Sequence, residues 1–202
     1  MGRWPDGSRE RLILAALDLF VEHGFDKTSV ADIAERAEVT ERTFYRHFGD
    51  KREVLFDGGG DFANSITSAV DAVASDTPPL DCVGAALEAS AVAYFSGDRQ
   101  PFARRRQMVI DANSELRERE LLKMARLSEA VADRLRSRGA DATTARVAAE
   151  MGITAFTSAF ARWVDAPAGA SLGPFIRESL DDVRGVARRL TDSDAGHRKI
   201  DR

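Results

Sequence analysis

The chain has 202 residues, a net charge of −4 and a sequence pI of about 5.5. This charge excludes a uniformly basic nucleic-acid coat, so any DNA-binding surface must be a local patch on an acidic protein. The only cysteine, Cys82, excludes an internal disulfide and a multi-cysteine metal site, and we expect it to be a buried, inert thiol.

Helical periodicity predicts an all-α protein. A first helix begins near Ser8 and ends at Gly24, and residues 28–29 are placed to cap a second, short helix. Thr40 can cap a third helix that runs to about residue 48, and Asp50 opens a fourth. Further helices are predicted over residues 80–96, 101–112, 115–138, 141–164 and 172–191, and a polar tail follows.

Three consecutive glycines, Gly58 to Gly60, interrupt the predicted fourth helix. Each glycine inside a helix costs about 1 kcal/mol relative to alanine. The sequence therefore predicts a break or hinge here, before the helical pattern resumes over residues 61–74.

Residues 28–48 have the outline of a helix-turn-helix, a motif whose second helix reads DNA. In that helix Phe44 and Phe48 are four residues apart, so they share one face, which we expect to be buried. The opposite direction is occupied by Arg42 and Arg46. A guanidinium can pair bidentately with guanine or with phosphate, so these two side chains are candidates for DNA contacts.

Positive charge is concentrated on this helix and its flank. From Arg42 to Arg52 there are four basic residues and one acidic residue, whereas residues 1–56 as a whole have nine basic and eleven acidic residues. Lys51 lies at the next helix start, where a cation and backbone N–H groups together suit a phosphate. The alternative is that the arginines form an ordinary solvated helix face, and charge alone does not decide between the two.

Three runs of residues resemble the tetracycline-repressor (TetR) family of bacterial regulators. Residues 9–20, followed by Gly24 and Phe25, resemble its first helix, and residues 28–34 resemble its second. Residues 39–51 resemble its recognition helix and the start of its fourth helix. Glycine, aromatic and lysine positions fall in register over about 50 residues, while the rest of the chain matches only in length and helical character.

The resemblance implies an all-α fold with three parts. A three-helix helix-turn-helix domain, residues 1–50, would be joined by a long fourth helix to a ligand-binding and dimerisation domain, residues 51–192, with a polar tail over 193–202. It implies a homodimeric regulator, by default a repressor, that binds a palindromic operator in double-stranded DNA and leaves it when a small effector binds. Activation is an alternative to repression, and the wider alternative is an all-α small-molecule-binding or interaction protein without specific DNA binding.

The resemblance also assigns DNA-binding roles residue by residue. Arg42 and Arg46 occupy variable positions of the family, which select the DNA sequence. We expect Glu41 to pair with an arginine or to stabilise the helix N-terminus, rather than to accept a hydrogen bond from cytosine. The full predicted set, which includes positions of backbone contacts, is Thr28, Ser29, Thr40, Glu41, Arg42, Thr43, Tyr45, Arg46, His47 and Lys51.

Two helices near the C-terminus carry small and apolar residues at helical spacing, and in the family the last two long helices form the dimer interface. The alternative is that the same residues form the core of a single chain. The predicted interface residues are Gly152, Phe156, Ala159, Trp163, Ile176, Leu180, Val183 and Ala187.

The middle helices are the predicted place of the effector pocket. Their candidate side chains are mostly apolar, which suggests a hydrophobic effector with few polar anchors, although most of them would equally suit a core. The candidates are Phe62, Ile66, Tyr94, Phe95, Phe102, Met108, Leu121, Met124, Leu127 and Phe160.

No pattern in the sequence supports catalysis. The three histidines lack metal-ligand spacing, and we find neither a Gly-rich phosphate loop nor a nucleophile elbow. We expect a protein that is not an enzyme and has no cofactor or metal. The longest uncharged stretches, such as residues 151–161, have 11 residues, and a membrane-spanning helix needs about 20. No apolar signal-peptide core follows Met1, so we expect a cytoplasmic protein.

Overall fold

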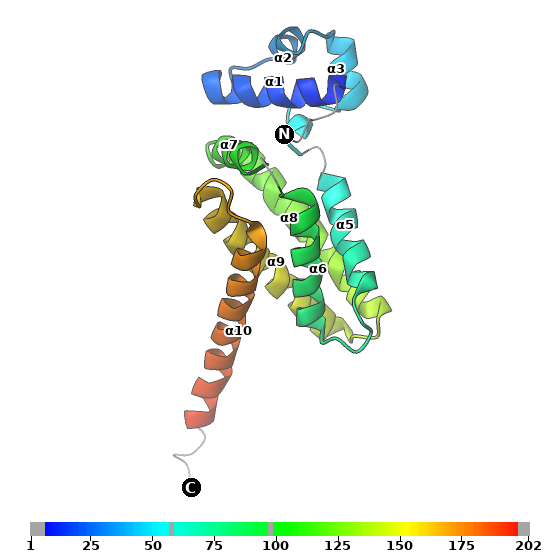
Figure 1. Cartoon of the computed structure of the whole chain (residues 1–202), viewed down its shortest axis with the longest axis vertical. Helices are drawn as coiled ribbons and strands as arrows, with labels where there is room; N and C mark the ends of the chain where they lie inside the picture. Colours follow the sequence, from blue (N-terminus) through cyan, green and yellow to red (C-terminus); the bar gives the residue numbers. More distant parts are fainter. Residues whose placement is uncertain (1–6, 57–58, 97–98, 198–202) are drawn as a thin grey trace. The chain divides into compact units, whose positions relative to one another are not determined.

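The computed structural model describes residues 7–56, 59–96 and 99–197, with the side chains beyond residue 190 excepted. Figure 1 shows that the regular secondary structure of these residues consists of α-helices, which confirms the predicted fold class. In the N-terminal part the helices are α1 (Ser8–His23), α2 (Val30–Arg36), α3 (Glu41–His47) and α4 (Glu53–Phe56). They are followed by α5 (Gly59–Ala72), α6 (Pro79–Tyr94), α7 (Arg99–Asp111), α8 (Ser114–Ser137), α9 (Ala142–Asp165) and α10 (Leu172–His197).

Two separate helices, α4 and α5, occupy the place of the predicted fourth helix. The first ends at Phe56, and the second begins at Gly59, inside the triple glycine. Gly58 lies outside the described residues. A hinge at the glycines therefore stays a hypothesis.

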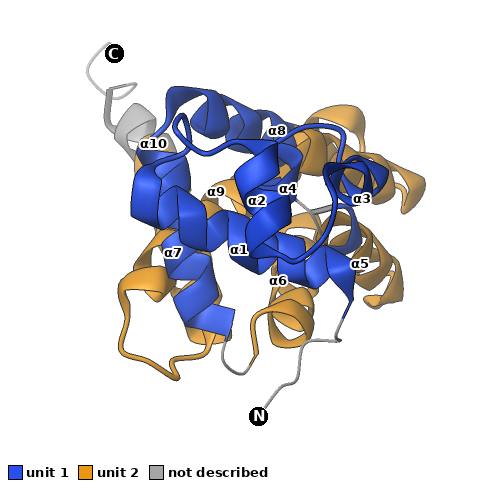
Figure 2. Cartoon of the chain, turned by 90° about the horizontal axis from the view of Figure 1, so that it is seen from above, with its two compact units in different colours: residues 1–61, 97–125 blue, residues 62–96, 126–202 orange. Residues whose placement is uncertain are grey.

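The chain divides into two compact units, which Figure 2 shows in different colours. Unit 1 consists of residues 1–61 and 97–125, and unit 2 consists of residues 62–96 and 126–202. The single helix α8 contributes its first half to unit 1 and its second half to unit 2. The domain boundaries at residues 50 and 192 stay a prediction.

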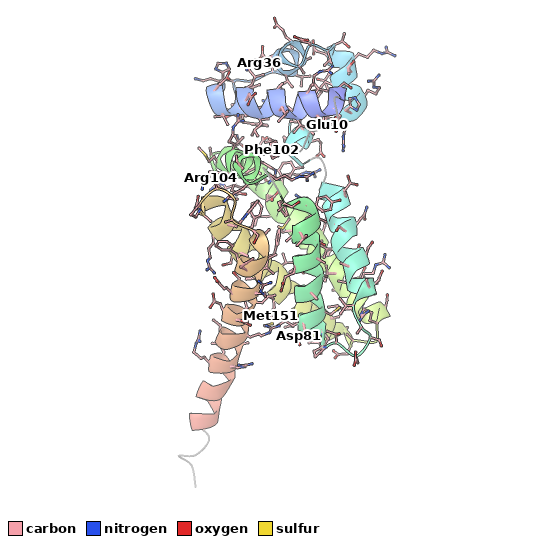
Figure 3. All side chains as sticks on the ribbon, in the orientation of Figure 1. Glu10, Arg36, Asp81, Phe102, Arg104 and Met151 are labelled. Carbon is pink, nitrogen blue, oxygen red and sulfur yellow. The ribbon has the colours of Figure 1, made fainter. Side chains whose placement is uncertain are left out.

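Unit 1 has one hydrophobic core. It is built on the buried side of α1, where Leu12, Ala16 and Phe20 recur at helical spacing. The core continues into α4 and into the α7–α8 region, and Phe102 of α7, labelled in Figure 3, packs against it. The members contributed from outside the first fifty residues are Val54, Leu55, Phe56, Val109, Ile110 and Leu116.

Unit 2 packs α6, α9 and α10 together. Small residues allow α6 and α9 to approach closely, because a methyl group added at Gly152 would lie 2.3 Å from the Cγ1 atom of Val83. Gly84 lies similarly close to Leu180 of α10. A glycine therefore lies at the close approach of α6 to α9 and of α6 to α10, and the apolar residues of α9 and α10 at these contacts are covered within one chain.

This packing corrects most of the predicted dimer interface. Six of the eight residues are buried inside the single chain, so their side chains cannot form a surface for a second copy: Gly152, Phe156, Ala159, Trp163, Ile176 and Leu180. Val183 and Ala187 are half-buried. The stripe of small and apolar residues is a core stripe, which was the alternative interpretation of the same pattern.

Candidate nucleic-acid interface

Helix α2, the following turn and α3 form a well-capped helix-turn-helix. Ser29 and Asp32 make a capping box at the start of α2, in which the Asp32 carboxylate accepts a hydrogen bond from the Ser29 backbone N–H at 2.7 Å. The hydrogen bonds from Ser29 lower the pKa of this carboxyl group, so it is ionised at neutral pH. In the turn, Glu38 adopts a left-handed conformation with φ of 54°, and Thr40 then caps α3 by accepting from the Thr43 N–H at 3.2 Å.

Aromatic packing fixes the rotation of α3 about its own axis. Phe44 and Phe48 are buried, with ring centroids 5.3 Å apart, as the sequence spacing predicted. Ile33 and Ala34 of α2 are buried in the same unit. A second clamp joins α1 to α2, where Arg36, labelled in Figure 3, pairs with Glu22 at 3.0 Å. With one face of α3 buried, the opposite face is held outward.

The outward face of α3 carries both arginines. Arg42 and Arg46 are exposed, and the Tyr45 side chain between them is also exposed. Arg42 makes no ion pair or hydrogen bond with another described residue, so its guanidinium is available to a ligand. Glu41 lies in the first turn of α3, where the positive end of the helix dipole stabilises its carboxylate. It forms no ion pair within the described part of the chain.

The remaining hydroxyl and imidazole groups are placed around this face. Ser29 and Thr40 are exposed at the starts of α2 and α3, and Thr43 is half-buried with its hydroxyl 3.1 Å from that of Thr40. The Nε2 atom of His47 lies 2.9 Å from the Ser8 hydroxyl at the start of α1. Sequence reasoning missed Ser8 as the partner of His47, because the two are 39 residues apart and have no local signal in common.

Two predicted phosphate contacts do not fit the structure. Thr28 is buried, and its hydroxyl donates to the backbone carbonyl oxygens of Leu19 and Gly24 at 3.3 and 2.9 Å. The Lys51 ammonium donates to the carbonyl oxygens of Phe25 and Thr28 at 2.7 and 2.9 Å. It also lies 4.1 Å from the centroid of the Phe25 ring. Both groups hold the segment between α1 and α2, so their polar atoms are already engaged within the chain.

Polar contacts tie the helix-turn-helix to α7 and to the first half of α8. Arg105 of α7 pairs with Asp18 of α1, and Arg119 of α8 pairs with Glu53 of α4. The side-chain amide of Asn113 donates to Asp26 at 3.3 Å. Within unit 1, the DNA-binding helices and these later segments therefore form one packed body.

The predicted effector-pocket residues fall into separate groups. In unit 2, Phe62, Tyr94, Phe95 and Phe160 meet Phe156 and Trp163 in a cluster of rings whose contacting centroids are 5.3–6.4 Å apart. Ile66 and Leu127 are buried.

The other four candidates belong to unit 1 and do not join the ring cluster. Phe102 packs on the unit 1 core and Met124 is half-buried. Met108 and Leu121 are exposed, so these two do not line an enclosed pocket in this structure.

No group of three or more metal-ligating side chains that could hold an ion occurs among the described residues. Over the same residues, no helix has the length and apolar character needed to cross a membrane.

Comparisons with known proteins place this geometry in a family. The sequence model described as "Bacterial regulatory proteins, tetR family" matches residues 12–57, and the model described as "MftR C-terminal domain" matches residues 77–188, more than half of the chain. The chain belongs to the tetR family of bacterial regulatory proteins. This confirms the resemblance seen in the sequence. The family and the relatives below are regulators, not enzymes.

Individual relatives are distant. The transcriptional regulator TcmR of Streptomyces glaucescens is 35% identical over 82 residues, which cover 41% of this chain and 36% of TcmR. The chain thus matches only about a third of that relative's length.

Two solved tetR-like structures share the fold at 20% identity. The repressor FadR of Thermus thermophilus in complex with lauroyl-CoA aligns with a TM-score of 0.50. The alignment covers 87% of this chain and 92% of the FadR chain. The SmeT–triclosan complex, whose repressor comes from Stenotrophomonas maltophilia, has a TM-score of 0.61 and covers 89% and 90%.

Proposed function

We propose that this tetR-family protein is a transcriptional regulator that binds operator DNA through the outward face of α3. The observation that carries the proposal is the pair of exposed guanidinium groups, Arg42 and Arg46, on a helix whose other face is locked into the core by Phe44 and Phe48. A short helix held in this way suits the major groove. Tyr45, Thr40 and Ser29 would position the helix on the DNA backbone.

A gel-shift assay with DNA from upstream of the protein's own gene tests this proposal. Arg42→Ala or Arg46→Ala should weaken specific binding by about 1–3 kcal/mol and relax base preference. Arg146→Ala is a matched control, because Arg146 is an exposed arginine on α9 of unit 2. If both α3 variants bind like the control, α3 is not the reading helix. If the wild type binds no DNA sequence specifically, the alternative of an all-α ligand-binding protein gains support.

The regulator would act as a homodimer and, by the family default, as a repressor. Two-fold symmetry would demand a palindromic operator with half-sites about one helical turn apart. Because the inner faces of α9 and α10 are used within one chain, the outer faces remain for a second copy. Exposed apolar side chains there are Val147 on α9 and Val186 and Leu190 on α10.

A small hydrophobic effector would release the DNA. Support comes from the largely apolar ring cluster of unit 2, and from the two structural neighbours that carry lauroyl-CoA and triclosan. A thermal-shift screen of apolar compounds tests this point. A compound that raises the melting temperature should also weaken operator binding, and a set of tight binders without any effect on DNA binding would contradict effector control.

A further inference from the structure

Two cations and one carboxylate lie on the sides of α7 and α8 that turn toward the interior of unit 1. Arg106 belongs to α7, and Glu120 and Lys123 belong to α8. Only 12%, 23% and 26% of these side chains are exposed, in that order. On α8 the two charged residues continue a stripe that is otherwise apolar, because Leu116 and Leu127 are buried at the same four-three-four spacing.

The Arg106 guanidinium makes two hydrogen bonds and a contact with an aromatic ring. Its Nε donates to the backbone carbonyl oxygen of Leu55 at 2.6 Å, and its Nη2 donates to Glu120 Oε2 at 3.0 Å. Its guanidinium carbon lies 5.2 Å from the centroid of the Phe56 ring. Arg106 thus joins α7 to α8 and to the end of α4, and it forms the closer ion pair with Glu120.

Within the part of the chain that the structure describes, Lys123 has no comparable partners. Its ammonium is 3.9 Å from Glu120 Oε2, beyond hydrogen-bond distance, and 6.0 Å from the centroid of the Phe56 ring. No hydrogen-bond acceptor for it occurs among the described residues. Lys51 of the same unit shows the contrast, because its ammonium reaches two carbonyl oxygens. A largely desolvated ammonium without acceptors is unfavourable unless a counter-charge arrives.

The pKa of Lys123 agrees with its small number of partners. Burial, followed by the positive charge of Arg106, lowers the pKa of Lys123 to about 8, and the opposing effect of Glu120 does not compensate. Among the described residues, Arg106 on α7, Glu120 on α8 and the uncharged Phe56 ring of α4 are the groups that face the ammonium. Counted over the described residues, one surplus positive charge is therefore held in a mostly buried place.

We propose that Lys123 and Arg106 form a binding site for an anionic oxygen group, a carboxylate or a phosphate, carried by the effector. The inference rests on the proposed function, since it assigns an anionic group to the effector, and the residues that would hold this group lie within unit 1. The site is connected to the DNA-binding helices because Arg106 also holds the Leu55 carbonyl oxygen of α4. An anion that engages Arg106 would compete with that bond and so act on the helix that follows α3.

Calorimetry on the full chain near pH 8 tests the site with three probes: decanoate, decanol and inorganic phosphate. An anion beside Lys123 favours the charged ammonium, so decanoate binding should take up about half a proton, measured by comparing buffers of different ionisation enthalpy. If the bound anion raises the pKa of Lys123 by about 1.3 units, decanoate gains about tenfold in affinity over decanol at pH 8, where half of the free protein already carries the charged ammonium. Decanol should bind without proton uptake.

Two variants separate the anion site from a structural role. Lys123→Met should bind decanoate about tenfold more weakly and abolish proton uptake. Lys123→Arg should keep the affinity but also lose proton uptake, because an arginine stays charged at this pH. Circular dichroism before each titration shows that both variants are folded.

The outcomes distinguish the possibilities. Phosphate binding with the same uptake assigns the site to a free anion, and binding of decanoate alone assigns it to an acid on an apolar chain; both support the inference. Decanoate binding that involves no proton uptake or is unchanged in Lys123→Met overturns it, as does a failure of both anions to bind. If the wild type still shifts operator DNA in that case, the anion site falls while the proposed regulator stands.

Discussion

Replacing Lys51 with methionine separates a structural role of this side chain from a contact with DNA phosphate. The ammonium donates two hydrogen bonds, at 2.7 and 2.9 Å, to the carbonyl oxygens of Phe25 and Thr28 and lies over the Phe25 ring. Hydrogen bonds of charged groups contribute about 1.5–3 kcal/mol each, and a partly exposed cation–π contact adds about 0.5–1 kcal/mol. Lys51 is half-buried, so water recovers part of the loss. We expect Lys51→Met to lower the free energy of unfolding by about 2–3 kcal/mol.

Two measurements on the same variant decide the matter. Thermal unfolding followed by circular dichroism should show a melting temperature lower by roughly 5–10 °C. Operator affinity measured from about 50 to 200 mM salt should keep its slope, because a lost phosphate contact would make the slope shallower by about one unit. Arg42→Ala is the reverse control, with an unchanged melting temperature and weaker binding. A Lys51→Met protein with wild-type stability and a shallower salt slope would refute the structural assignment.

Three further outcomes are expected. Gly152→Ala should destabilise the fold by about 1–3 kcal/mol in urea titrations, because the new methyl group overlaps Val83, and Val83→Ala in the same chain should relieve part of the loss; simple additivity would argue against the close crossing. The pKa of Lys123 is about 8 in the folded protein and about 10.4 in the unfolded chain, so folding disfavours the charged ammonium. The free energy of unfolding of the wild type should therefore rise by up to about 3 kcal/mol from pH 8 to 10. A Lys123→Met protein that shows the same rise would exclude Lys123 as its cause. Val186→Glu combined with Leu190→Glu should convert the proposed dimer to monomer in analytical ultracentrifugation without a loss of helix content, and a persistent dimer would place the interface elsewhere.

The features that the sequence predicted well depend on local order. The burial of Phe44 and Phe48 and the exposure of Arg42 and Arg46 follow from one helical period and from caps a few residues away. The all-α class follows from the same periodicity repeated along the chain. Family membership could be recognised because the matching positions lie within a single run of about 50 residues.

The features that it predicted badly depend on distant partners. Nothing near Lys51 shows that its ammonium reaches carbonyl oxygens more than twenty residues away. The small residues around Gly152 suit a close approach of any helix, and only the packing of α6 shows that the approaching helix belongs to the same chain. The sequence does not indicate the burial of Lys123, because a lysine within a helix usually lies on an exposed face, and the groups packed near its ammonium come from α4 and α7.

The core of unit 1 limits how this protein can be divided or recombined. Val109, Ile110 and Leu116 are part of the same buried cluster as Leu12 and Phe20. A fragment cut after the helix-turn-helix would therefore expose apolar surface that the later segments normally cover, and we expect it to aggregate or to fold only partially. A hybrid regulator that borrows the DNA specificity of this chain should carry residues 97–125 along with the first 61, or replace the lost contacts with those of its new host.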